Sequence, residues 1–236
     1  MITAIIPARG GSKTIPRKNL VEIGGHPLIA YSIAACSLAK NIDRIIVSTE
    51  DAEIADVSRS YGAEVPFMRP DELSRDDSSD VGFLTHFFSE VSDEHVALIR
   101  PTTPFRDPRF MDETIEMYFT LHDSVTGLRT VEETNDNPYK IYQINGNICQ
   151  GFFLDFMGNP DYTNLPRQSF PKAYVGNGHI DIIKKKTVDT ESTFGAKIHA
   201  VVCEKMIDID SQADLEYARY NIQKGSLLLD HLKGST

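Results

Sequence analysis

The sequence predicts an α/β domain built on a mostly parallel central sheet. Short apolar runs at residues 3–7, 44–49 and 96–99 alternate with segments in which apolar residues recur at helical spacing. This alternation is typical of a parallel sheet with crossover helices, whose ligands bind at the carboxyl ends of the strands. A chain of 236 residues suffices for one such domain with a full core, so we expect a single domain over 1–236.

The composition excludes several other classes of protein. Apolar residues make up 41% and charged residues 25%, as in ordinary globular proteins. A net charge of -10 disfavours nucleic acid and anionic membranes as partners. Cys36, Cys149 and Cys203 are far apart, which supports neither a disulfide framework nor a zinc site. With no apolar run of membrane-spanning length and no signal peptide pattern, we expect a cytoplasmic protein.

Local signals predict the elements of the first half of the chain. Pro27 suits the first turn of a helix that extends to about residue 40. Residues 48–51 (Ser-Thr-Glu-Asp) favour a second helix start, and Gly62 ends that helix. We expect residues 65–68 to form a brief third strand.

The middle of the chain continues the same alternation. A polar loop over 69–79 precedes a helix over 81–90. The strand at 96–99 leads into a proline-rich, rigid loop, in which Arg100 and Arg106 offer anion contacts. A helix over 111–121 follows, and residues 124–128 close another strand–helix unit.

The pattern changes from about residue 132 to residue 180, where glycine, asparagine, proline and aromatic residues dominate. We expect an inserted arm there, which either covers the site or pairs with a second subunit. The chain rejoins the sheet at 180–183 and 197–203. A last helix begins at Ser211 with a capping box, and we expect a loose tail after Lys224.

A glycine-rich, basic loop follows the first strand. Arg9, Lys13, Arg17 and Lys18 lie within ten residues, and two adjacent glycines precede Ser12. Adjacent glycines allow unusual backbone angles and close approach of a ligand. Free N–H groups and cations are what a polyphosphate needs, although a solvated basic turn is the alternative. The loop is neither a Walker A motif nor a dinucleotide fingerprint.

A pair of carboxylates, Asp208 and Asp210, precedes the last helix. In an extended segment, residues two apart point the same way, so both carboxylates can face one ion. Two oxygen ligands plus phosphate oxygens suit Mg²⁺. The alternative is that these residues only cap the helix.

Residues 6–13 (Ile-Pro-Ala-Arg-Gly-Gly-Ser-Lys) and 16–19 (Pro-Arg-Lys-Asn) resemble the signature loop of the acylneuraminate cytidylyltransferases, the CMP-sialic acid synthetases. This resemblance implies a Rossmann-like nucleotide-diphospho-sugar transferase fold and a homodimer that forms through the arm. Similar segments spread over most of the chain, at 27–33, 43–49, 62–70, 101–106, 138–140, 167–168, 177–178 and 208–215.

The resemblance also implies roles for individual residues. Those matching the nucleotide-binding positions are Ala8, Arg9, Gly10, Gly11, Ser12, Lys18, Asn19, Arg69, Ser78 and Ser79. Those matching positions near the sugar acid are Arg100, Thr102, Lys140, Arg167, Asn177, His179 and Asp181. Catalysis would rest on Arg9, Lys18, Asp208 and Asp210, of which the two aspartates would hold Mg²⁺.

Three departures from the family pattern concern the sugar pocket. Arg100 stands where the family usually has glutamine, and the usual Asn-Gly-Ala-Ile-Tyr becomes Asn-Gly-His-Ile-Asp over 177–181. A usual pair of phenylalanines upstream of the metal segment has no clear counterpart. We therefore expect a legionaminic or pseudaminic acid at least as readily as N-acetylneuraminate. Alternatively, Arg100 or His179 pairs with Asp181 to hold the loops.

The resemblance implies transfer of CMP from CTP to the anomeric hydroxyl of a sialic-acid-like 2-keto-3-deoxy sugar acid, with release of pyrophosphate. Two alternatives stay open. One is a nucleotidyltransferase that uses another base or a different ulosonic acid such as an octulosonate. The other is a non-catalytic sugar-nucleotide binding protein.

Overall fold

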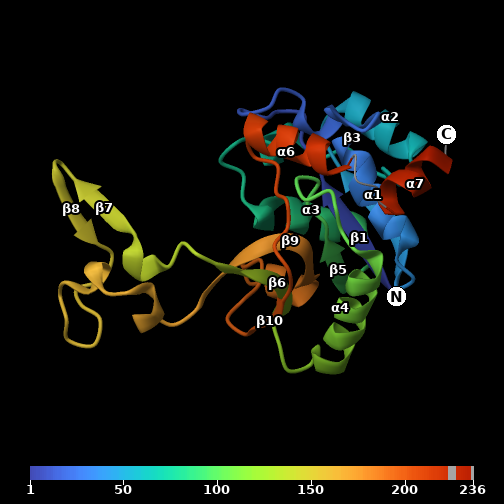
Figure 1. The fold of residues 1–236 in the computed structure, drawn as a ribbon. Coiled ribbons are helices and arrows are strands. Elements are labelled where there is room, and N and C mark those ends of the chain that lie inside the picture. Colours follow the sequence, from blue (N-terminus) through green and yellow to red (C-terminus); the bar gives the residue numbers. More distant parts are fainter. Residues whose placement is uncertain (223–226, 235–236) are drawn as a thin grey trace.

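A six-stranded sheet with the order β10-β6-β9-β5-β1-β4 forms the centre of the computed structural model, which describes residues 1–222 and 227–234 (Figure 1). β1 pairs in parallel with β4 and β5, and β10 with β6, whereas β9 runs antiparallel between β5 and β6. The prediction of an α/β domain with a mostly parallel sheet is confirmed. The strands are β1 (Ile2–Pro7), β4 (Ile42–Ser48), β5 (His95–Leu98), β6 (Gly127–Thr134), β9 (Ala173–Lys184) and β10 (Ile198–Val202).

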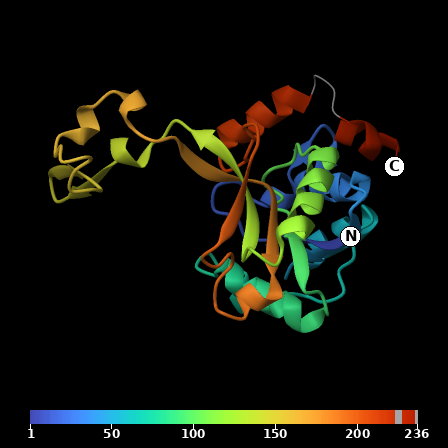
Figure 2. The same cartoon turned by 90° about the horizontal axis from the view of Figure 1, so that it is seen from below.

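Helices cover both faces of this sheet (Figure 2). One face packs against the larger apolar core, to which Ile29, Ile115 and Leu215 belong, and the other against a smaller core around Phe87. The larger core is formed with α1 (Leu28–Leu38), α2 (Ala52–Ser60), α4 (Pro108–Leu121), α6 (Gln212–Ile222) and α7 (Leu227–Gly234). The smaller core is formed with α3 (Asp80–Glu90) and α5 (Lys185–Val188).

Side-chain caps fix the start of several helices. Asp51 accepts a hydrogen bond from the Ile54 N–H at 2.9 Å, as the second predicted helix start requires. Ser211 and Asp214 bond each other's backbone N–H groups at the start of α6, which confirms the predicted capping box. Each such cap stabilises its helix by about 1 kcal/mol.

Two expected elements are different in the structure. Residues 65–68 form no strand; a single bridge joins Ile46 to Glu64, and Pro66 has no N–H to extend the pairing. The expected loose tail is instead partly helical. α7 buries Leu228, Leu229 and Leu232 in the main core, because its apolar residues recur at helical spacing. Residues 223–226 lie outside the described part of the chain.

A glycine turn and a short hairpin connect the basic loop to α1. Gly24 and Gly25 have φ angles of 58° and 86°, which glycine adopts without strain. This turn joins β2 (Glu22–Ile23) to β3 (His26–Pro27) in an antiparallel pair.

The inserted arm projects from the body between β6 and β9 (Figures 1 and 2). Because β6 ends at Thr134 and β9 begins at Ala173, the arm spans 135–172, and residues 173–180 are part of the central sheet. Tyr139 stacks on Phe170 with ring centroids 5.3 Å apart, at the centre of a small aromatic cluster. The arm contains β7 (Tyr142–Asn145), β8 (Ile148–Gly151), η3 (Pro138–Lys140), η4 (Tyr162–Asn164) and η5 (Arg167–Ser169).

Among residues 1–222 and 227–234, no helix combines the length and the apolar character needed to cross a membrane.

Candidate active site

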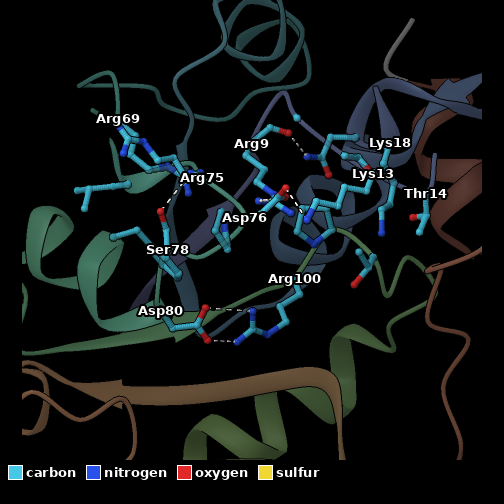
Figure 3. A pocket seen from close by; sticks show the side chains of 18 residues that line it. Arg9, Lys13, Thr14, Lys18, Arg69, Arg75, Asp76, Ser78, Asp80 and Arg100 are labelled. Carbon is cyan, nitrogen blue, oxygen red and sulfur yellow. Dashed lines mark hydrogen bonds and ion pairs between the residues drawn. The ribbon is translucent and has the colours of Figure 1, made fainter. Parts of the chain in front are cut away.

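A cavity of about 430 Å³ opens at the carboxyl ends of β1 and β5, where the α/β pattern predicts a ligand (Figure 3). Its walls come from three segments far apart in the sequence: the basic loop, the loop before α3 and the residues after β5. The structure thus brings together many of the predicted residues. Those that line the cavity are Arg9, Gly11, Ser12, Lys18, Asn19, Arg69, Ser78, Arg100 and Thr102.

Sequence reasoning missed part of this lining. Lys13 belongs to the predicted cation cluster but was not assigned to the site, whereas Arg75 and Asp76 gave no local signal. Asp76 accepts from both cations of the opposite loop: its Oδ1 lies 2.9 Å from Arg9 and its Oδ2 lies 2.8 Å from Lys13. These cations, Lys13 foremost, lower the pKa of Asp76. The further lining residues are Pro7, Thr14, Leu73, Asp80, Phe83 and Pro101.

The backbone of the basic loop is strained at Arg17 rather than at the glycines. Arg17 has a φ of 56°, whereas the φ angles of Gly10 and Gly11 are not positive. Arg17 forms ion pairs with Asp51 and Glu53 at the start of α2, which fasten the loop to that helix. The conformational freedom that the two glycines allow is therefore not used for a positive φ.

Gly10 is needed for close packing instead. A Cβ atom there would lie 2.6 Å from Oδ2 of Asp51, and the Gly10 N–H donates to Glu50 at 2.6 Å. Gly11 has no atom within 4 Å of such a Cβ and faces the cavity. Ala8 is fully buried behind the cavity, and Ser79 caps α3.

Lys18 links the basic loop to the predicted metal segment. Its Nζ donates to the Ile209 carbonyl and to Oδ1 of Asp210, both at 3.1 Å. The Ile209 N–H donates to the Thr102 carbonyl at 2.8 Å, and the Ile209 side chain is buried. Asp208 and Asp210, on either side, are exposed and do not themselves line the cavity; Asp210 adjoins it through its bond to Lys18. Because Ser211 and Asp214 cap α6, the pair is not needed as a cap.

The residues present fit a Mg²⁺ site that is completed by substrate oxygens. In the described part of the chain, no group of three His, Cys, Asp or Glu side chains could enclose a metal ion. Mg²⁺ usually takes one or two carboxylates, with phosphate oxygens and waters as its other ligands. Asp208 and Asp210 have that composition beside a cation-lined cavity.

Arg100 and Asp80 form a charged pair on the cavity wall. Arg100 donates to both carboxylate oxygens of Asp80, and its side chain is partly exposed. Asp181 is 1% exposed and does not line the cavity; its nearest ion-pair partner is Arg129, with Oδ1 and Nε 3.8 Å apart. Burial raises the pKa of Asp181 to about 6.

His179 is also buried and pairs with neither Asp181 nor Arg100. Its ring lies 4.7 Å from the Phe110 ring, and its Nε2 lies 3.4 Å from the Asp107 carbonyl. Burial lowers its pKa to about 4, so the ring is neutral at neutral pH. The alternative in which Arg100 or His179 holds Asp181 as a direct partner is therefore wrong.

Arg106 is a structural residue, contrary to the expectation that it contacts anions. Only 3% of it is exposed, and its guanidinium donates to the His179 carbonyl at 2.7 Å and the Gly178 carbonyl at 2.8 Å. It also bonds Ser32 Oγ at 2.9 Å. With its donors directed at protein oxygens, Arg106 holds the proline-rich loop against β9.

Lys140, Arg167 and Asn177 are not brought to the cavity of their own chain. Lys140 donates to two carbonyls of the arm at 2.7 and 2.8 Å, and Arg167 donates to Asn135 at 2.8 Å. Both lie in the projecting arm (Figure 1). Asn177 is buried beside Cys203.

Comparison with known proteins now identifies the family. A family model described as Cytidylyltransferase matches residues 3–146, more than half of the chain. The chain belongs to the cytidylyltransferase family. Its fold is therefore that of a family of nucleotidyltransferase enzymes, as the resemblance of the basic loop implies.

The names of individual relatives state related enzymatic activities. The chain is 34% identical over 221 residues to the N-acylneuraminate cytidylyltransferase of Escherichia coli O18:K1:H7, covering 92% of this chain but 51% of that protein. It thus spans about half the length of this relative. It is 36% identical over 196 residues to the CMP-N,N'-diacetyllegionaminic acid synthase of Legionella pneumophila, covering 70% of this chain and 84% of that one. Identity to the pseudaminic acid cytidylyltransferase of Campylobacter jejuni is 29% over 229 residues, with 91% and 93% covered.

A solved structure confirms the fold of the family. CMP:2-keto-3-deoxy-manno-octonic acid synthetase complexed with CTP superposes with a TM-score of 0.72 at 15% identity, covering 94% of this chain and 98% of that one. At this identity the likeness concerns the fold alone.

Proposed function

We propose that this cytidylyltransferase transfers CMP from CTP to the anomeric hydroxyl of a sialic-acid-like 2-keto-3-deoxy sugar acid and releases pyrophosphate. The observation that carries the proposal is the convergence of Arg9, Lys13, Lys18 and Arg75 on one cavity, with the Asp210 carboxylate bonded to Lys18 beside it. Such an arrangement suits a triphosphate and a bound metal. The names of the relatives from three bacteria support the choice of sugar acid.

The cations would act on charge that grows during the transfer. As the sugar hydroxyl attacks the α-phosphorus, negative charge accumulates on the phosphate oxygens and on the departing pyrophosphate. Arg9 and Lys18 lie on opposite parts of the basic loop and can neutralise both. Asn19 donates to the Arg9 carbonyl at 2.8 Å and so holds the loop in its cavity-lining form. Positioning and charge stabilisation suffice, without a covalent intermediate.

Asp208 and Asp210 are the residues that would hold Mg²⁺. When bound, the ion would neutralise phosphate charge and ease deprotonation of the attacking hydroxyl. Lys18 keeps this segment against the cavity through Ile209 and Asp210. The hydrogen bond from the Ile209 N–H to the Thr102 carbonyl holds the backbone between the two carboxylates. It thereby fixes their position relative to the cavity wall.

The sugar acid would bind where Arg100 and Thr102 line the cavity beside the metal segment. Its carboxylate needs a cation, which Arg100 can supply by exchanging one of its bonds to Asp80. His179 and Asp181 are buried behind this wall, so we propose that they shape the pocket from behind. Legionaminic and pseudaminic acids and N-acetylneuraminate all belong to the proposed substrate class.

We further propose a homodimer that forms through the arm. Ile144, Leu154 and Met157 are 75%, 95% and 90% exposed on it, an unusual display of apolar side chains. A second copy packed on this surface would cover them. It would also give Lys140 and Arg167 a route to a sugar acid, in the partner's cavity rather than their own. An enzyme that consumes CTP is expected to act in the cytoplasm.

Pyrophosphate release tests the proposed activity. The purified chain is assayed with each of four nucleoside triphosphates, with Mg²⁺, against a panel of nonulosonic acids and an octulosonate. We expect release with CTP and at least one nine-carbon acid. Release only with an octulosonate, or with another nucleotide, would favour the alternative nucleotidyltransferases. Binding of CTP without release under any combination would favour a non-catalytic binding protein.

A further inference from the structure

One acidic side chain lies among the cations that the proposed function assigns to phosphate. Asp76 approaches the cavity from the loop before α3 and is 45% exposed. Each of its carboxylate oxygens forms an ion pair with a different cation: Oδ1 with Arg9 at 2.9 Å, and Oδ2 with Lys13 at 2.8 Å (Figure 3). A carboxylate that bridges two cations occupies them in the same manner as two oxygens of a phosphate.

We propose that Asp76 is an intramolecular competitor of phosphate for Arg9 and Lys13. The nucleotide's phosphates must take these cations from Asp76 to bind, and Asp76 retakes them when pyrophosphate leaves. The inference rests on the proposed function, because it requires that phosphate oxygens bind at Arg9 and Lys13.

Geometry favours competition over passive support. The side chain of Lys13 is 75% exposed, and that of Arg9 is 36% exposed. A carboxylate that only supports a ligand-binding cation would lie behind it, away from the ligand. Asp51, for comparison, pairs with Arg17 outside the cavity. Asp76 instead lines the cavity itself. A phosphate bound beside an undisplaced Asp76 would lie against a like charge, which is unfavourable.

The loop that carries Asp76 has its own internal restraints. Ser78 Oγ donates to the Glu72 carbonyl at 2.9 Å and accepts from the Arg75 N–H at 3.1 Å. These bonds lie within the loop and do not involve Arg9 or Lys13. Release of Asp76 therefore leaves the local turn intact, and Arg75, which also lines the cavity, stays available to the ligand.

A neighbouring residue provides a matched control. Asp77 is exposed, follows Asp76 directly, and forms no ion pair with Arg9 or Lys13. Asp76→Asn and Asp77→Asn remove the same charge from adjacent positions. Any general effect of net charge on anion binding is common to both, whereas competition at the two cations is specific to Asp76.

Calorimetric titration with inorganic pyrophosphate, in a buffer with a metal chelator, tests the proposal without requiring turnover. We expect Asp76→Asn to bind pyrophosphate about three- to tenfold more tightly than the wild type, the scale of one or two exposed ion pairs, and Asp77→Asn to match the wild type within about twofold. Asp76→Ala should tighten binding as well, and thermal melts check that each variant is folded.

Three results would overturn the proposal, and they differ in what they imply. Weaker or unchanged binding in folded Asp76→Asn and Asp76→Ala would show that Asp76 supports the cations or has no influence on them. Failure of the wild type and all three variants to bind pyrophosphate would contradict the phosphate site itself, and with it the proposed function. Equal tightening in Asp77→Asn would reduce the effect to net charge and would also overturn the inference.

Discussion

Oδ1 of Asp181 lies 3.8 Å from Nε of Arg129, and both of these atoms are buried without a hydrogen-bond partner. Arg129 lies over the Phe194 ring at 4.8 Å and fills the space that a side chain at Gly176 would need, since a Cβ there would lie 2.4 Å from Nε. Burial outweighs the attraction of Arg129 and Arg100 and raises the pKa of Asp181 to about 6.

This raised pKa predicts how stability depends on pH. The native state holds the Asp181 proton more tightly than the unfolded chain, so native stability falls as pH rises from about 4 to about 6. A shift of roughly two pKa units corresponds to about 3 kcal/mol in total. In Asp181→Asn this part of the fall should be absent. Urea unfolding of both proteins at several values between about pH 4 and pH 7 measures it, and parallel stability curves would contradict the assignment.

Removing a cation of the basic loop should slow turnover. Arg9→Ala and Lys18→Ala should each reduce it by more than about tenfold, because charge-assisted hydrogen bonds contribute roughly 1.5–3 kcal/mol. Arg59→Ala is the control, since Arg59 lies on α2 and pairs with Asp56 outside the cavity. Steady-state rates at saturating substrate measure the effect. Full activity in a folded Arg9 or Lys18 variant would show that the substituted residue does not stabilise the transition state.

The proposed metal role and the observed capping role fall on different residues, and two variants separate them. Asp210→Asn should raise the Mg²⁺ concentration needed for half-maximal rate and leave the melt nearly unchanged. Asp214→Ala should cost about 1 kcal/mol of stability, because Asp214 accepts from the Ser211 N–H at 2.8 Å, and should keep the Mg²⁺ dependence. The reverse pattern would assign capping to Asp210.

The two adjacent glycines should respond differently to alanine. Gly10→Ala places a methyl group 2.6 Å from Asp51 Oδ2, so we expect a loss of about 1–3 kcal/mol. Gly11→Ala has open space and should change stability by less than about 0.5 kcal/mol. Denaturant unfolding compares them. Equal losses would show that backbone freedom, rather than packing against Asp51, selects glycine here.

The arm should control the oligomeric state. Leu154→Asp and Ile144→Asp place charges on its two most exposed aliphatic positions outside the turn at Met157. We expect these variants to sediment as monomers while the wild type sediments as a dimer. A monomeric wild type, or dimers that persist in both variants, would contradict assembly through this surface.

Local patterns in the sequence predict most of the fold, because they depend on neighbouring residues. Alternating apolar runs indicate the sheet, and Asp51 and Ser211 indicate helix starts, as the structure confirms. The strand expected at 65–68 does not form because Pro66 has no backbone N–H to donate to a neighbouring strand. This loss outweighs the apolar character of the adjacent residues.

The site was only partly predictable, for a physical reason. Arg9, Lys18 and the Asp208 segment lie in short motifs that can be recognised from residues adjacent in the sequence. Asp76, by contrast, acquires its role from two cations more than sixty positions earlier, through contacts that depend on the fold. Burial likewise cannot be read from residue type: Arg106 and Asp181 are polar residues that the packing of β9 encloses.

The most direct test of the central claim is the identity of the product. The chain is incubated with CTP, Mg²⁺ and the sugar acid panel, and mass spectrometry follows the nucleotide while pyrophosphate is quantified. We predict a CMP-linked sugar acid that accumulates in equal amount to pyrophosphate and is strongly reduced with Arg9→Ala. Free CMP as the sole nucleotide product, or no product from CTP with every acid, would contradict the account.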